Sequence, residues 1–523
     1  MITRKWQRWW AMIGVVFGLG WGLLSQSTRT EAATKPVLLV VDSQNAATTA
    51  PAQLDALQRL LTSMALPVET VRLTAYRAHQ LTPRRYSGVI TMINWPQSRL
   101  GNATFERDRQ KFNGPDLHIG TNLTAWEAKR LGAKRVALHH QQFNLREGEQ
   151  QQLLPYQVAM TGLTRLATTS QTQGWLVTQT AQERHYPFGL VNHQRGYLPY
   201  FEPQGLALIM VAKTIRTLFH TGQPQPPLLT ITGVTPYSDM NALLRVIRLL
   251  YHEGIPFAIS TTSVDVNTKL PAFERFSAVL RAAEKRNGII FLRTPIETGI
   301  QRLRGRTLQR VLRTEVTALS QHNVFPVGLS SPGRWNQTLR TQTAGLSLAS
   351  TNLLLPTPTA AKLTDHNQRA RTYAHSFFGV PLNQLSAVTH AEAIQFQMPT
   401  ALTVPLPQRA TDRQALRRQL RRLQLTWFNP ALGALTTRIK AGTADVQYQA
   451  GTYQLNGRVV ADLDVGPGWW RQRQPKRQVR WIDRYFQAQS HVLLVLFMVI
   501  GAVLLVFGVL GYRVYRRMFI KSD

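Results

Sequence analysis

Four histidines, His139, His140, His185 and His193, are the side chains of this sequence best suited to bind a metal ion. Zinc sites need convergent His or carboxylate ligands at characteristic spacing. The four histidines lie among short predicted strands, where no helical pair four residues apart and no acidic partner is expected. The pattern therefore favours ordinary surface or core histidines over a metal site.

A second polar group, Asp42, Ser43 and Asn94, follows apolar segments that are predicted to be strands. Parallel α/β folds bind ligands at the carboxyl ends of their strands, which makes these residues candidates for a site. No glycine-rich phosphate loop accompanies them. Structural turn residues are the favoured interpretation.

The elements that position these residues alternate between strand and helix in two regions. Apolar runs such as KPVLLVV and LLTITGV are each followed by a segment with helical spacing. Repeated βα units predict an α/β fold, with a parallel, flavodoxin-like layer over 36–135 and either a barrel or a second parallel sheet over 226–365. Short predicted strands connect them over 136–225, and a mixed α/β region is expected over 366–468.

Charge is the unusual property of the composition. The 523 residues include 61 Lys and Arg against 27 Asp and Glu, a net charge of +34. Such a charge attracts polyanions, among them anionic lipids and anionic cell-wall polymers. No nucleic-acid-binding motif is present, so nucleic acid is not an expected partner. The absence of cysteine excludes disulfides and thiolate chemistry.

Both ends of the sequence carry membrane signals. A basic start and an apolar run within 1–33 predict a signal peptide or an uncleaved N-terminal anchor. The uncharged segment 491–512 would extend about 33 Å as a helix, which matches the lipid bilayer and predicts a transmembrane helix. The basic tail 513–523 is then cytoplasmic, and 34–490 is expected outside the cell membrane.

Aromatic and basic residues alternate in the juxtamembrane segment 469–490. Aromatic rings favour the headgroup level of a bilayer, and cations attract anionic lipids. An interfacial helix is predicted, with a solvated linker as the alternative. Its expected membrane-contacting residues are Trp469, Trp470, Arg477, Arg480, Trp481, Arg484 and Tyr485.

The stretch from 228 to about 340 resembles a polysaccharide-deacetylase-like family, the domain of unknown function 2334. The resemblance rests on TGVTPYSD after a strand, LYHEGIPFAIS one helix later, then GIIFLRTPIE and GLSSPGRW. It covers about a quarter of the chain. It implies a distorted (β/α) barrel similar to that of metal-dependent carbohydrate esterases.

The resemblance fails at the catalytic positions. Where the family has two aspartates, this sequence has Thr232 and Gly233, and Arg293 and Glu297 stand where the family has a metal-binding histidine pair. Metal-assisted hydrolysis needs a bound cation to activate water, and an arginine repels one. We therefore expect a retained scaffold that has lost catalysis and binds no metal or other cofactor.

The resemblance also implies which residues surround the mouth of the barrel. Aromatic faces and charged hydrogen-bonding groups suit the binding of a polysaccharide. The candidate ligand-binding residues are Tyr237, Asp239, Arg293, Glu297 and Trp335.

Three functions are compatible with these features. The favoured hypothesis is a membrane-anchored, extracytoplasmic accessory protein that binds or guides a surface polysaccharide during synthesis or export, with a membrane glycosyltransferase or synthase as a partner. One alternative is an active deacetylase or hydrolase with relocated catalytic residues. The other is a structural protein that tethers the membrane to anionic cell-wall polymers.

Overall fold

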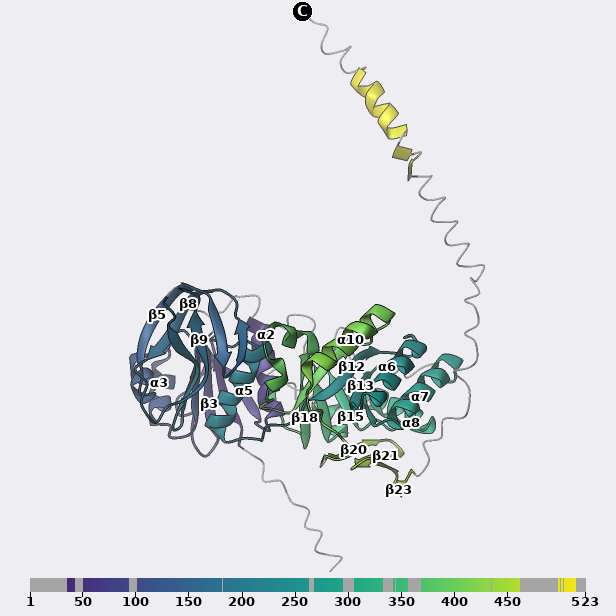
Figure 1. The fold of residues 1–523 in the computed structure, drawn as a ribbon, viewed down its shortest axis with the longest axis horizontal. Coiled ribbons are helices and arrows are strands. Elements are labelled where there is room, and N and C mark those ends of the chain that lie inside the picture. Colours follow the sequence, from purple (N-terminus) through teal and green to yellow (C-terminus); the bar gives the residue numbers. More distant parts are fainter. Residues whose placement is uncertain are drawn as a thin grey trace, which may run out of the picture. The chain divides into compact units, whose positions relative to one another are not determined.

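The computed structural model describes part of the chain, which divides into two compact units, Met1–Val465 and Gly466–Asp523. Each unit is considered by itself below (Figure 1). The described residues are 35–42, 50–93, 101–180, 182–262, 268–294, 305–332, 342–343, 345–355, 368–433, 435–460, 497–498, 500–501 and 503–513.

The first unit begins with the parallel half of a ten-stranded sheet, in the order β17-β2-β1-β3-β4-β11-β10-β9-β6-β7. Strand β1 is VLLVV and is buried along its whole length, as expected of a parallel strand covered on both faces. The parallel strands are β1 (Val37–Val41), β2 (Val68–Arg72), β3 (Gly88–Ile93), β4 (Asp116–Gly120) and β11 (Arg195–Leu198). Their connections include α2 (Ala50–Ser63), η1 (Leu73–Ala75), α3 (Ala103–Lys111) and α4 (Ala125–Arg130).

Antiparallel strands extend this sheet beyond β11, and a separate two-stranded ribbon accompanies them. The antiparallel strands of the sheet are β6 (Phe143–Glu147), β7 (Gln150–Leu153), β9 (Gln171–Thr178) and β10 (His185–Asn192), and β5 (Lys134–Gln141) and β8 (Gln157–Thr164) form the ribbon. Helix α5 (Gly205–Phe219) packs on the sheet with eleven buried residues. It leads into the second half of the unit.

Seven parallel strands close into a barrel, which confirms the α/β class and the expected barrel. They are β12 (Leu228–Val234), β13 (Phe257–Thr261), β14 (Gly288–Arg293), β15 (Gly328–Ser331), β16 (Thr351–Leu354), β18 (His375–Pro381) and β19 (Thr400–Pro405). Helices α6 (Met240–His252), α7 (Pro271–Glu284), α8 (Gly305–Gln321) and α10 (Ala410–Leu423) accompany them (Figure 1).

The barrel ends at residue 405, beyond the limit of 365 that the sequence suggested. Strands β18 and β19 complete the closure, because β18 pairs with β16 and β19 pairs with β12. No long helix joins β18 to β19; the described connection has the short turns η5 (Leu382–Ala387) and η6 (Ala391–Ala393). The pattern of alternating strands and long helices therefore did not predict that β18 and β19 belong to the barrel.

A small antiparallel sheet follows the barrel helices. It consists of β20 (Thr436–Ala441), β21 (Ala444–Gln449), β22 (Thr452–Leu455) and β23 (Arg458–Val459). Burial alternates along β20, so one face of this sheet packs inward, against α8 and next to the short turn η3 (Leu346–Leu348). The remaining strand, β17 (Arg369–Ala370), pairs with β2 and so joins the ten-stranded sheet.

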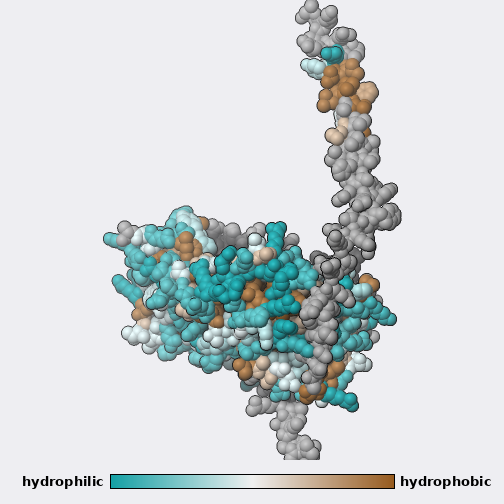
Figure 2. All heavy atoms as spheres, turned by 45° about the vertical axis from the view of Figure 1, so that its right-hand side comes forward, coloured by the Kyte–Doolittle hydropathy of each residue, from teal (hydrophilic) through white to brown (hydrophobic). Residues whose placement is uncertain are grey.

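Described residues of the second unit include a helical segment at 503–513. Its large apolar side chains are exposed, and Leu504, Leu505 and Phe507 are each more than 60% exposed (Figure 2, brown). Within the described residues, no helix is both long enough and apolar enough to cross a membrane. The transmembrane helix expected over 491–512 thus stays a prediction.

Helix α7 ends with a buried carboxyl group that is unusual in a core. Glu284 is 6% exposed, and its Oε1 accepts a hydrogen bond from the backbone N–H of Phe325 at 2.8 Å. Its Oε2 has no hydrogen-bond partner among the described residues. Burial raises the pKa of Glu284 from 4.5 to about 8, against the smaller lowering effects of the Phe325 amide and Arg281. The folded protein therefore holds this carboxyl protonated at neutral pH.

We predict that Glu284→Gln removes a pH dependence of stability. An unfolded glutamate loses its proton near pH 4.5, whereas the folded one keeps it to about pH 8, so the contribution of Glu284 to the free energy of unfolding falls as the pH rises from 5 to 8. The slope is about 1.4 kcal/mol per pH unit. Relative to wild type, the variant should gain about 2–4 kcal/mol between pH 5 and pH 8 in urea unfolding.

Glu274→Gln is the matched control, because Glu274 lies exposed in the first turn of the same helix. It should leave the pH dependence of the wild-type protein unchanged. Identical pH profiles for wild type and Glu284→Gln would show that the buried carboxyl is ionised in the folded state.

Candidate functional site

The carboxyl end of β12 lies at the mouth of the barrel, where the sequence places Thr232 and Gly233. The pairing of β12 with β13 shifts register between Ile231 and Val234, which marks an irregularity of the bulge type. Gly233 adopts φ +76°, a left-handed conformation that glycine tolerates best. A Cβ at Gly233 would meet no atom within 4 Å, so the conformation, not space, favours glycine. The Thr232 hydroxyl donates to the backbone carbonyl of Val404 at 3.4 Å.

Arg293 at the end of β14 faces the interior of the barrel. Ser260 on β13 and Ser330 on β15 are separated by β14, yet their hydroxyls hydrogen-bond at 2.7 Å. Side chains of non-adjacent strands converge on the inside of a closed barrel, so both serines point inward. Arg293 is beside Ser330 in the parallel register, and residues in register share a face. The guanidinium therefore extends from the interior toward the mouth.

The surroundings of Arg293 leave its charge incompletely solvated. The side chain is half-buried, and its Nε is buried without a hydrogen-bond partner in the described part of the chain. Burial lowers the pKa of the Arg293 guanidinium from its ordinary value. A fixed cation in this place repels a divalent metal ion and favours a carboxylate or phosphate oxygen.

The other candidate residues of the barrel are placed differently. Tyr237 is 75% exposed in the turn after β12. Asp239 begins α6 and accepts hydrogen bonds from the backbone N–H groups of Asn241 and Ala242, at 2.9 and 3.0 Å. This carboxylate is thus occupied in capping the helix.

Several predicted site residues lie outside the described residues. These are Ser43, Asn94, Glu297, Trp335 and the juxtamembrane residues Trp469, Trp470, Arg477, Arg480, Trp481, Arg484 and Tyr485. Asp42 is described and is partly buried directly after β1.

The four histidines do not converge. His139 and His140 are exposed on β5, and the Nδ1 of His140 lies 3.1 Å from the Tyr156 hydroxyl. His185 lies 3.6 Å from Glu183, an acidic neighbour that the sequence analysis did not expect. Throughout the described residues, no three His, Cys, Asp or Glu side chains are grouped as metal ligands.

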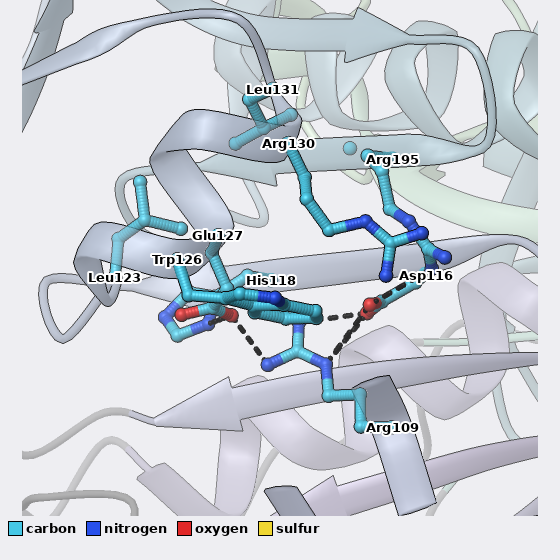
Figure 3. A pocket seen from close by; sticks show the side chains of 10 residues that line it. Arg109, Asp116, His118, Leu123, Trp126, Glu127, Arg130, Leu131 and Arg195 are labelled. Carbon is cyan, nitrogen blue, oxygen red and sulfur yellow. Dashed lines mark hydrogen bonds and ion pairs between the residues drawn. The ribbon is translucent and has the colours of Figure 1, made fainter. Parts of the chain in front are cut away.

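A buried cluster of charges in the ten-stranded sheet was not predicted from the sequence. Arg109 on α3 donates to Asp116 on β4 at 2.7 Å and also to Glu127 on α4. The Nδ1 of His118 lies 2.8 Å from Glu127, and Arg195 on β11 donates to Asp116 at 3.1 Å. Figure 3 shows Arg109 between the two carboxylates, with His118 beside one and Arg195 beside the other. Four elements meet at these five side chains.

The cluster is electrostatically balanced and nearly without space. Burial alone would raise the pKa of Glu127, but Arg109 and His118 hold it well below its usual range. Asp116 and Glu127 raise the pKa of Arg109 despite its burial. The cavity beside these groups measures about 10 Å³, enough for one water molecule. The arrangement therefore joins elements of the sheet and leaves no room for an organic ligand.

Replacing Arg109 by methionine should destabilise the protein strongly. The change leaves Asp116 and Glu127 buried without their shared cation, and breaking a buried ion pair costs about 3–5 kcal/mol. Urea unfolding of the full chain at pH 7 measures the loss.

Arg107→Met serves as the control, since Arg107 is exposed on the same helix and its Nε donates to the Ala103 carbonyl of that helix. Its effect should stay within about 0.5 kcal/mol. Equal stability of the two variants would contradict a structural role for the cluster.

Comparisons with known proteins leave the family open. No protein-family model matches the chain, and a search of curated proteins found no significant match. Among solved structures, the chain is similar to a ThuA-like protein from Bacteroides uniformis, with a TM-score of 0.26 and 12% sequence identity. That similarity covers 36% of this chain and 92% of the other.

Proposed function

We propose that this protein is a membrane-anchored, extracytoplasmic accessory protein that binds a surface polysaccharide at the mouth of its barrel without cleaving it. The observation that carries the proposal is the placement of Arg293 at the mouth. A half-buried guanidinium whose Nε has no partner among the described residues is suited to bind an anionic group of a polymer. It is unsuited to share a site with a catalytic metal ion.

The charge of the chain favours an acidic polysaccharide. A net charge of +34 raises the local concentration of any polyanion near the protein, while Arg293 supplies a directional contact. Long-range electrostatic attraction alone is weakened by salt and is nonspecific. The planar guanidinium of an arginine, in contrast, can form two parallel hydrogen bonds to a carboxylate or phosphate group and so selects such groups. The two contributions can be separated by experiment.

Membrane anchoring is supported by the C-terminal sequence and by the helix at 503–513. That helix exposes apolar side chains such as Leu504, Phe507 and Leu510. A helix that is apolar on all sides is characteristic of a buried or membrane-inserted segment. The uncharged segment 491–512, followed by a basic tail, accounts for this exposure if it enters the bilayer. Such an anchor would hold the barrel close to a membrane synthase that releases the polymer.

The binding proposal predicts a loss of affinity in Arg293→Gln. The full chain in detergent should bind alginate, a polyuronate, saturably, and this variant should bind it roughly ten- to a hundredfold more weakly, as expected for one lost charged hydrogen bond. Arg293→Lys should restore only part of the affinity, because an ammonium group lacks the planar fork. Isothermal titration at two salt concentrations measures these affinities.

Arg418→Gln is the matched control, since Arg418 is exposed on α10 and its loss changes the net charge equally. It should weaken alginate binding by less than about twofold. Equal losses in both variants would replace the proposal with tethering by overall charge.

An enzymatic role is tested on the same preparation. The proposal expects no acetate release from acetylated alginate and no stoichiometric divalent metal. Turnover together with one bound metal per chain would overturn the proposal and favour a relocated catalytic site.

A further inference from the structure

Helices α6, α7 and α10 all end at the same end of the barrel, opposite to the mouth. Helix α6 leads into the start of β13, and α7 leads into the start of β14. Shortly after α10, the backbone N–H of Phe428 donates to the carbonyl of Pro227, the residue before β12, at 2.9 Å. The three helix ends therefore gather around the amino-terminal ends of β12, β13 and β14.

Side-chain contacts join these helix ends into one surface. Glu253, the residue after α6, accepts hydrogen bonds from Arg417 and Arg421 on α10, at 2.8 and 3.0 Å. The guanidinium carbon of Arg286, just after α7, lies 5.9 Å from the ring centre of Tyr251 on α6. Residues of all three helix ends are thus in contact with one another.

A short turn after α10 extends this surface. The Asn287 side chain, next to the end of α7, donates to the Asn429 Oδ1 at 3.1 Å, and the same oxygen accepts from the backbone N–H of Ala431 at 3.0 Å. The Asn429 carbonyl accepts from the N–H groups of Leu432 and Gly433, at 3.2 and 2.8 Å. These hydrogen bonds fix the shape of the turn and the position of Leu432 on it.

Apolar side chains are exposed on this surface. Leu432 is 86% exposed, the largest exposed fraction of any large hydrophobic side chain among the described residues. Tyr251 is 54% exposed, and Trp427, between α10 and the turn, is partly exposed. Exposed apolar groups with a polar rim are typical of sites that meet a protein or a membrane. We call Tyr251, Arg286, Arg421, Trp427 and Leu432 the Leu432 surface.

The charge around these apolar side chains is positive. Arg248 is exposed three residues before Tyr251, and neighbours at this spacing share one side of a helix. Together with Arg286, Arg417 and Arg421 it gives four positive charges against one negative charge, that of Glu253. Cations at helix carboxyl ends also stabilise the helices, which accounts for part of this charge. That effect does not account for exposed leucine and tyrosine among the arginines.

The combination of charge and apolar side chains favours a lipid surface over other occupants. A soluble polyanion would pair with the arginines and leave Leu432 in water. A stable protein interface buries about 800 Å² on each partner, more than a few separate apolar side chains supply. A bilayer accepts a shallow apolar tip, places tyrosine and tryptophan at the headgroup level, and offers anionic lipids to arginines.

We propose that the Leu432 surface docks on a bilayer that contains anionic lipids. Leu432 inserts below the headgroups, Tyr251 and Trp427 lie at their level, and Arg286 and Arg421 lie beside lipid phosphates. The proposal rests on the membrane anchoring proposed above, because the anchor keeps a bilayer beside the protein. Docking directs the opposite end of the barrel, with Arg293, away from the membrane.

The test uses the full chain in nanodiscs, with one nitroxide label on Thr426→Cys, an exposed position directly before Trp427. The sequence has no other cysteine to react. Electron paramagnetic resonance measures collisions of the label with a water-soluble nickel complex. Nanodiscs of phosphatidylcholine with phosphatidylglycerol should shield the label from nickel, and phosphatidylcholine alone should shield it less. The same label on Val158→Cys, exposed on β8, should collide freely in both.

Leu432→Ser tests the inserted side chain. In the Thr426-labelled chain it should lower the ratio of docked to undocked molecules about ten- to a hundredfold, because one apolar side chain no longer enters the lipid. Val158→Ser is the matched control, since it also removes an exposed apolar side chain but lies on β8. It should leave that ratio unchanged.

The outcomes distinguish docking from anchoring. Equal nickel access to the labels at Thr426 and Val158, in anionic nanodiscs that hold the chain, would overturn docking and leave the anchor intact. Failure of the chain to enter nanodiscs would contradict the anchor and docking together. An unchanged ratio in Leu432→Ser would also overturn the proposal. Strong dipolar coupling between Thr426 labels of two chains would assign the surface to a second copy instead.

Discussion

One buried guanidinium, that of Arg59 on α2, connects the two halves of the first compact unit. It is 1% exposed, and its Nε donates to Asp55 one turn earlier at 2.8 Å. Its Nη1 donates to the backbone carbonyls of Ser331 and Leu355, at 3.0 and 2.7 Å. These carbonyls belong to the last residue of β15 and to the residue directly after β16. A helix of the sheet therefore also holds the barrel through backbone acceptors of two of its strands.

The barrel scaffold does not depend equally on every position along its strands. The barrel depends on closure by seven parallel strands and on fully buried side chains on both of their faces, such as Phe291 inside the barrel and Ile259 outside it. Positions near the carboxyl ends differ in burial: Thr232 and Arg293 are partly buried and Gly233 is exposed, whereas Val234, the last residue of β12, is fully buried. Chemistry at the less buried positions can vary on a constant scaffold.

The sequence predicted what depends on local pattern and missed what depends on distant residues. Apolar runs and helical spacing identified the βα units and the barrel, because each unit is continuous in the chain. The charged cluster joins Asp116 to Arg195, which is 79 residues away. A local signal for this cluster was available in the sequence. The consecutive segments DLHIG and TNLTAWE contain two acidic residues and a histidine, Asp116, Glu127 and His118, in and just after one strand.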